Sequence, residues 1–153
     1  MEPRWLDERE MAAWLPFVRL LTALPSALDT QLRDETGISH LYYQVLVMLS
    51  AAPDGARRMS ELARTTSMSL SRLSRAVASL EERGWVERRP CSDDRRGQVA
   101  HLLPAGRRAL EAAAPGHVAE VRRRVFDRLT REQVEQLREI SGRLLSGLHD
   151  GPS

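Results

Sequence analysis

The sequence predicts a mainly α fold with a small β-hairpin unit of two or three strands. Three observations support this fold class: helical apolar spacing covers both ends of the 153-residue chain, two helical segments joined by a polar turn occupy its middle, and two short strand-like segments follow them. The hydrophobic content of 42% and the charged content of 29% are close to the averages of soluble globular proteins. We therefore expect one compact folded domain.

The N-terminal part of the chain predicts two helices. Apolar residues recur at helical spacing over residues 11–32, and Gly37 ends that pattern. Pro16 and Pro25 fall inside it, and because an interior proline removes a backbone hydrogen bond, we expect this segment to be broken or kinked. A second helix, over residues 39–50 with a serine N-cap at its first position, is too apolar to lie on a surface.

The middle of the chain resembles a helix-turn-helix. A short helix over residues 60–65 and a polar turn at 66–68 precede a longer helix, which Ser69 caps and Gly84 ends. The longer helix has an apolar face and an opposite face that is polar and basic. The apolar face comprises Leu73, Val77 and Leu80, and the polar face comprises Ser71, Arg72, Ser74, Arg75 and Ser79.

Two strand-like segments come next, at residues 85–90 and 98–103. The charged loop between them, residues 91–97, contains turn residues, so the two segments form a hairpin. A hairpin that follows a helix-turn-helix in this order is a wing.

The C-terminal part of the chain predicts two long helices. Pro104 suits the first position of a helix, and we expect a break at Pro115 and Gly116 before the apolar spacing continues. Thr130 and Gln133 form a capping box at the start of the last helix. The apolar stripe of that helix comprises Val134, Leu137, Leu144, Leu145 and Leu148. Such a stripe must be buried against another surface, and a partner subunit is the natural candidate.

Positive charge is concentrated in the middle of the chain. The net charge is only +2, but residues 57–103 hold ten arginines against six acidic residues, a local balance of +4. All 23 basic residues are arginine, a residue that binds phosphate and guanine bidentately. We attribute most of this preference to the codon bias of a GC-rich genome.

Cysteine usage and the N-terminus predict a cytoplasmic protein. Cys91 is the single cysteine and cannot form an intramolecular disulfide, and Met1 leads into charged residues rather than a signal peptide. We also expect no membrane association, on the reading that no apolar run approaches the roughly 20 residues that a membrane span requires.

The order of elements and two local motifs resemble the MarR family of winged-helix transcriptional regulators. Residues 60–86, SELARTTSMSLSRLSRAVASLEERGWV, are similar to the paired helices of the family. Residues 93–106, DDRRGQVAHLLPAG, are similar to its wing and to the helix start that follows. The chain departs from the family pattern at Leu103, which replaces a capping threonine, and at Ser67, where helix-turn-helix units often have glycine.

The resemblance implies one domain, residues 1–153, that forms a homodimer. Residues 1–36 and 105–149 correspond to dimerisation helices, and residues 38–103 correspond to the winged helix-turn-helix lobe. Two such lobes place their recognition helices at the half-sites of a pseudo-palindromic operator in double-stranded DNA. The implied function is a sequence-specific DNA-binding transcriptional regulator, a repressor that a small-molecule effector releases, with no catalysis and no cofactor.

The candidate DNA-binding residues lie in the recognition helix and in the wing. They are Ser69, Leu70, Ser71, Arg72, Ser74, Arg75, Asp94, Arg95 and Arg96. Either Arg72 or Arg75 is placed to read guanine, whereas the serines are expected to bond phosphates. One wing arginine is expected to enter the minor groove. The resemblance favours Arg96 for this role, held in position by Asp94.

Four aromatic residues form a candidate effector pocket for a small aromatic or amphipathic molecule. They are Trp14, Phe17, Tyr42 and Tyr43. The resemblance implies this place because effectors in the family commonly bind where the first two helices meet the winged-helix lobe. Aromatic residues at helical spacing are more often part of a core, so this simpler interpretation stays open.

Two other functions are compatible with the same sequence features. The main alternative is a winged-helix protein-interaction module without DNA binding, which uses the same basic face for an acidic partner. A weaker alternative is a thiol-based sensor or enzyme that uses Cys91. The four histidines lack the short spacing of metal ligands, and no phosphate-binding loop or Ser-His-Asp arrangement stands out, so neither a metal site nor an enzyme is predicted.

Overall fold

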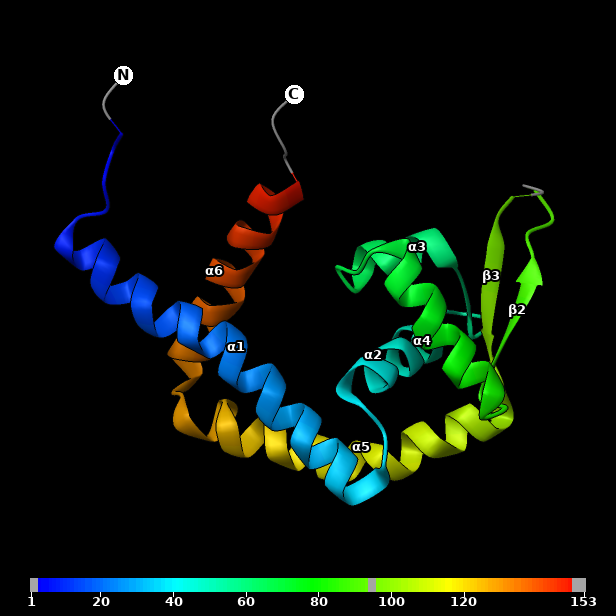
Figure 1. Ribbon diagram of the computed structural model, residues 1–153. Coiled ribbons are helices and arrows are strands. Elements are labelled where there is room, and N and C mark those ends of the chain that lie inside the picture. The colour runs from blue at the N-terminus through cyan, green and yellow to red at the C-terminus, as the bar shows by residue number, and fades with distance from the viewer. Residues whose placement is uncertain (1–2, 94–95, 150–153) are drawn as a thin grey trace. The chain divides into compact units, whose positions relative to one another are not determined.

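The computed structural model describes residues 3–93 and 96–149 and confirms a mainly helical chain with a small antiparallel sheet (Figure 1). The helices are α1 (Glu8–Thr36), α2 (His40–Ser50), α3 (Met59–Thr65), α4 (Leu70–Glu82), α5 (Pro104–Arg124) and α6 (Arg131–His149), with a 3-10 turn, η1 (Phe126–Arg128). The strands are β1 (Ala56–Arg58), β2 (Val86–Pro90) and β3 (Gln98–Leu102). The chain divides into two compact units, residues 1–117 and 118–153.

Helix α1 is continuous despite its two interior prolines. Asp7 and Glu10 form a capping box at its start, and Gly37, with a φ of 70°, ends it. The expected break at Pro16 or Pro25 is absent. Both prolines are exposed, so a carbonyl that loses its amide partner is able to bond water instead.

The composition of α1 corrects one expectation from the sequence. By length and composition alone this helix is able to cross a membrane, because an 18-residue stretch of it has a mean hydropathy of 1.4. Within residues 11–28, Arg19 is the one charged residue, so an apolar run of nearly membrane-spanning length does exist. One such helix is weak evidence for a membrane, because helices that pack in soluble proteins pass the same test.

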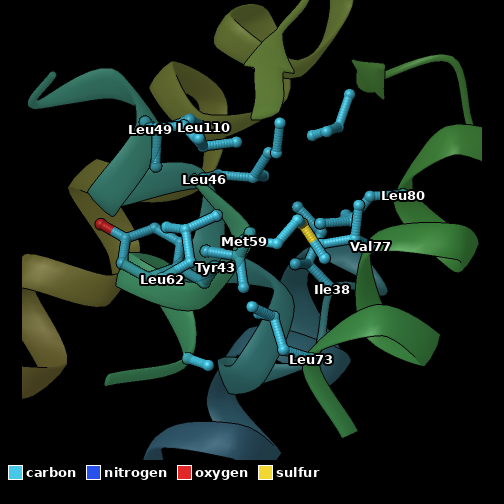
Figure 2. Packing of buried hydrophobic residues seen from close by; sticks show 14 of the residues in the cluster. Ile38, Tyr43, Leu46, Leu49, Met59, Leu62, Leu73, Val77, Leu80 and Leu110 are labelled. Carbon is cyan, nitrogen blue, oxygen red and sulfur yellow. The ribbon is translucent and has the colours of Figure 1, made fainter. Parts of the chain in front are cut away.

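The core of the first unit is built around α2. Val45, Leu46 and Leu49 are completely buried in this helix, which confirms that it is too apolar for a surface. They pack with buried side chains from α1, α3, α4, β3 and α5 in one cluster (Figure 2). The faces of α3 and α4 that do not pack in this cluster are turned to solvent. The core therefore determines which side of α4 is exposed.

The sheet contains the predicted hairpin and one further strand. Its order is β1-β3-β2, and β2 pairs with β3 in a register that places Val86 opposite Leu102 and Pro90 opposite Gln98. Strand β1 pairs with the other edge of β3. The wing is therefore anchored on both sides of β3.

Helix α5 begins at Pro104, as predicted, but does not break at Pro115 and Gly116. It continues through both residues to Arg124. In the second unit, Thr130 and Gln133 exchange hydrogen bonds of 2.9 and 3.2 Å at the start of α6, so the predicted capping box is present. The apolar side chains of α6 are exposed in the single chain: Leu137, Ile140, Leu144, Leu145 and Leu148.

Candidate nucleic-acid interface

Helix α4 is amphipathic and is held by its apolar face. Ser69 caps it as predicted, since the Ser69 hydroxyl accepts a 3.2 Å hydrogen bond from the amide of Arg72. The buried face consists of Leu73, Ala76, Val77 and Leu80. The candidate residues Leu70, Ser71, Arg72 and Arg75 are exposed on the other side. The start of α4 thus offers two guanidinium groups to the solvent.

The turn before α4 requires an unusual backbone conformation. Ser67 has a φ of 54°, the one positive φ outside glycine in the described part of the chain. The amide of Met68 bonds to the carbonyl of Ala63 at 2.9 Å and closes the turn. The serine that stands in the place of the usual glycine therefore adopts the left-handed geometry that glycine prefers.

An ion pair joins the wing to α4, and sequence reasoning missed it. Glu81, in the last turn of α4, accepts hydrogen bonds from the backbone amide of Arg88 at 2.8 Å, from its Nε at 3.0 Å and from its Nη2 at 2.7 Å. The Nη1 of Arg88 also donates to the Ser74 hydroxyl at 3.0 Å. Ser74, predicted to bond phosphate, is thus engaged within the protein. An i to i+7 pair between a helix and a strand leaves no periodic signal in the sequence.

The wing loop is closed at its base. The amide of Cys91 donates to the carbonyl of Gly97 at 2.9 Å, and Asp93 lies 3.5 Å from the guanidinium of Arg58 on β1. Arg96 is exposed beyond this closure. The candidates Asp94 and Arg95 lie outside the described residues.

A small hollow separates the start of α4 from the wing. Its volume is about 300 Å³, and it lies between the recognition-helix and wing candidates. Leu70 and Ser74 line it from α4, while Arg96 and Gln98 line it from the wing. The two groups of predicted residues therefore border one continuous surface of the first unit.

Known proteins that resemble this chain identify its family. The model of the MarR family matches residues 36–97. The chain is 46% identical to Sco3205, a MarR family transcriptional regulator of Streptomyces coelicolor solved in complex with DNA; the match covers 99% of this chain and 94% of that one, with a TM-score of 0.92. The chain belongs to the MarR family.

Two further relatives agree with the assignment. AbsC, a MarR family transcriptional regulator of Streptomyces coelicolor, is 33% identical over 96% of this chain and 99% of its own, with a TM-score of 0.88. The transcriptional repressor MprA of Escherichia coli strain K12 is 30% identical over 113 residues, 73% of this chain. The match spans 63% of the length of MprA.

Family membership confirms several predictions. The predicted winged helix-turn-helix fold is the fold of these regulators, and the family consists of transcription regulators rather than enzymes. Nothing in these comparisons supports the alternative of a winged-helix module without DNA binding.

The four aromatic residues of the predicted effector pocket do not meet within one MarR chain. Trp14 and Phe17 contact each other, with ring centroids 6.2 Å apart, on the exposed part of α1. Tyr43 is buried against His117, with ring centroids 4.3 Å apart. Asp29 of α1 bonds the amide that begins α2, and Trp14 lies about 22 Å further along α1, at 1.5 Å per residue. This distance separates the two aromatic pairs.

One of the four residues does line a cavity. Tyr42 borders a pocket of about 670 Å³ formed by the end of α1, the start of α2, the turn before α4 and parts of α4. The pocket is polar: Asp29, Arg33, His40 and Arg83 line it beside Tyr42. The guanidinium of Arg83 lies over the Tyr42 ring, 5.5 Å from its centroid. The cavity is therefore more charged than the predicted aromatic site.

Proposed function

We propose that this MarR protein is a sequence-specific double-stranded DNA-binding transcriptional regulator in the cytoplasm and that it acts as a repressor. The observation that carries the proposal is the 46% identity, over 99% of the chain, to a MarR regulator solved in complex with DNA. The exposed side of α4 supports it, because it offers Arg72 and Arg75 near the helix N-terminus, where base edges are reached. Repression follows from occlusion of a promoter that overlaps the operator.

The proposed contacts divide into reading and positioning contacts. Arg72 or Arg75 reads guanine in the major groove, and the serines at the helix start, Ser69 and Ser71, bond phosphates beside Leu70. One wing arginine, Arg95 or Arg96, enters the minor groove. The family resemblance favours Arg96 for this role, with Asp94 holding the arginine in position. Ser74 accepts a hydrogen bond from Arg88, and its hydroxyl hydrogen remains available to donate to a phosphate.

The proposed active form is a homodimer that binds a pseudo-palindromic operator. The exposed apolar residues of α1 and α6 support this form, since a stripe of that kind is stable in water only when another surface covers it. Residues 1–36 and 105–149 supply the dimerisation helices, and residues 38–103 supply the DNA-binding lobe. Burial in the dimer also accounts for the membrane-like composition of α1.

A small-molecule effector is the proposed release signal. The pocket of about 670 Å³ is large enough for a small ligand, and it joins α1 and α2 to the turn before the recognition helix. A ligand there lowers operator affinity only if it binds the DNA-free arrangement more tightly than the DNA-fitting one. Its lining supports an effector site that includes Tyr42 rather than the Trp14 and Phe17 pair.

Selection of bound sites from random duplexes tests the proposal. We expect enrichment of a pseudo-palindrome with half-sites about 10 base pairs apart. We also expect log Kd to rise linearly with log salt, with a slope set by the number of phosphates contacted. Duplex binding without sequence preference, or no duplex binding at low salt, would contradict the proposal and favour a protein-interaction module.

A further inference from the structure

Strand β2, which leads into the wing, is joined to the recognition helix α4 by side-chain hydrogen bonds as well as by the turn between them. Residues 83–85 form that turn, and Gly84 within it has a φ of 68°. Apart from its chain neighbours, no described residue has an atom within 4 Å of the position that a Cβ of residue 84 would take. Beyond the turn, Arg88 of β2 bonds both Glu81 and Ser74 of α4. Ser74 and Glu81 lie two helical turns apart, so one strand residue holds α4 at two points along its length.

This ion pair differs from an ordinary surface salt bridge. Both oxygens of Glu81 are occupied, one by the Arg88 amide and the other by two guanidinium nitrogens, and the side chains of Glu81 and Arg88 are only 29% and 23% exposed. The hydrogen bonds from Arg88 hold the pKa of Glu81 below its ordinary value, against the opposing effect of burial. Exposed single-contact pairs contribute little, whereas multidentate pairs with a backbone donor define a geometry.

The contacts constrain a degree of freedom that the hydrophobic core leaves open. Val86 and Leu80 are buried in the shared cluster and set the distance between β2 and α4. Apolar packing is non-directional, however, and a strand is able to slide or rotate on it. Directional hydrogen bonds to two points on the helix remove that freedom.

We propose that Glu81 and Arg88 form a positioning clamp that sets the wing relative to the recognition helix and thereby sets operator affinity without contacting DNA. The inference rests on the proposed function, because it assumes that α4 and the wing bind adjacent grooves of one duplex. Contacts in two grooves add only when their spacing matches the duplex. Loosening the clamp therefore weakens binding through the wing.

A competing role for Arg88 is a direct phosphate contact. The two roles predict opposite changes in operator affinity for Glu81→Gln. If Arg88 bound phosphate, neutralising the adjacent carboxylate with Glu81→Gln would remove a repulsive charge and strengthen binding. Arg88→Gln would then also lower the slope of log K against log salt by about one unit. If the pair is a clamp, both variants weaken binding, and they change the slope equally because both displace the same wing.

The experiment uses the full-length chain and an operator obtained by selection, with affinities measured well below the unfolding temperature of every variant. We expect Glu81→Gln and Arg88→Gln each to weaken operator binding about tenfold, which corresponds to the loss of one charge-assisted hydrogen bond. The double variant should be no weaker than Arg88→Gln, because Arg88→Gln already removes the side-chain contact that Glu81→Gln weakens. Glu87→Gln is the matched control, since Glu87 pairs with Arg89 in the same strand but is exposed, and it should leave affinity unchanged.

A second measurement separates positioning from simple stabilisation. Arg96→Ala should cost less operator affinity in the Glu81→Gln background than in the wild type, because a misplaced wing already contributes less. An equal cost in both backgrounds overturns the clamp, as does a gain in affinity from Glu81→Gln or a salt slope that Arg88→Gln lowers and Glu81→Gln does not. A wild-type chain that binds no duplex overturns the proposed function itself, and the clamp with it.

Discussion

The imidazole rings of His40 and His117 lie 5.6 Å apart, where the start of α2 meets α5. His117 is buried, its Nδ1 has no hydrogen-bond partner among the described residues, and its ring also contacts Tyr43. Burial lowers the pKa of both histidines below the ordinary 6.5, and the neighbouring His40 charge lowers the pKa of His117 further. Asp29 opposes the shift at His40 without cancelling it.

The first prediction is that acid destabilises the protein through this pair. Because the unfolded histidines bind protons near pH 6.5 and the folded ones do so only at lower pH, the stabilisation is complete above that value and is lost as the pH falls below it. Urea unfolding followed from about pH 7.5 to about pH 5 should show a falling free energy of unfolding. His117→Gln should flatten the fall, while His101→Gln, a change in β3 outside the pair, should not. A wild-type curve that is level over this range would contradict the prediction.

Gly106 is predicted to tolerate no side chain. A Cβ there would lie 2.3 Å from the carbonyl oxygen of Trp85 and 2.9 Å from Cδ1 of Leu102, and the Trp85 carbonyl also accepts the amide that precedes α5. Gly106→Ala should therefore lower the free energy of unfolding by about 1–3 kcal/mol. Gly142→Ala in α6, where nothing lies within 4 Å, should instead raise it by roughly 0.5–1 kcal/mol. Thermal unfolding of the two variants measures this difference in sign.

Arg72 and Arg75 are predicted to govern specificity. Both are exposed on the polar side of α4, so alanine at either position removes a DNA contact and leaves the core intact. A bidentate contact to guanine predicts a loss of about 1–3 kcal/mol on the operator and a smaller loss on random duplex. Fluorescence anisotropy with both duplexes is the measurement. If each variant lost the same affinity on both duplexes, the two arginines would be phosphate contacts only.

Arg96 is predicted to contribute affinity from the wing. Removing its charge with Arg96→Ala should weaken binding and lower the salt slope by about one unit for each phosphate that the guanidinium neutralises. Asp94→Ala should act in the same direction, because the proposed role of Asp94 is to hold the arginine in position and not to contact DNA. Titrations at several salt concentrations test both variants, and unaltered affinity in both would remove the wing from the interface.

The exposed stripe of α6 is predicted to hold the dimer together. Ile140 and Leu144 are 55% and 49% exposed in the single chain, so a charge at either position leaves the core of the chain undisturbed. Ile140→Glu should convert the dimer to a monomer at micromolar concentration in analytical ultracentrifugation, because a carboxylate would be buried without a partner. Glu139→Gln, one position away and exposed, should leave the dimer intact. A wild-type chain that sediments as a monomer, or an Ile140→Glu variant that stays dimeric, would contradict this interface.

Local patterns in the sequence predicted the elements that carry the candidate interface. The Ser69 cap, the apolar face of α4 and the β2 to β3 hairpin are all correct, since each depends on neighbours within a few residues. The same local reasoning was wrong at Pro115. There an interior proline predicted a break, but α5 continues through it, as α1 does through its own prolines. One missing hydrogen bond at an exposed position costs little, because the carbonyl that loses its amide partner bonds water and the helix continues on both sides.

Only the tertiary structure decided which distant residues meet. It placed β1 against β3, joined Arg88 to Glu81 and Ser74, and left Trp14 far from Tyr42 although both belong to the predicted aromatic pocket. The type and spacing of neighbouring residues determine whether a segment forms a helix, a strand or a turn. The order of those elements in turn determined the family fold. Contacts between elements depend instead on how whole faces of helices and strands pack. A rigid helix also separates residues along its axis by a distance that the amino-acid composition does not reveal. For that reason the recognition helix was visible in the sequence, while the contacts that hold the wing beside it were not.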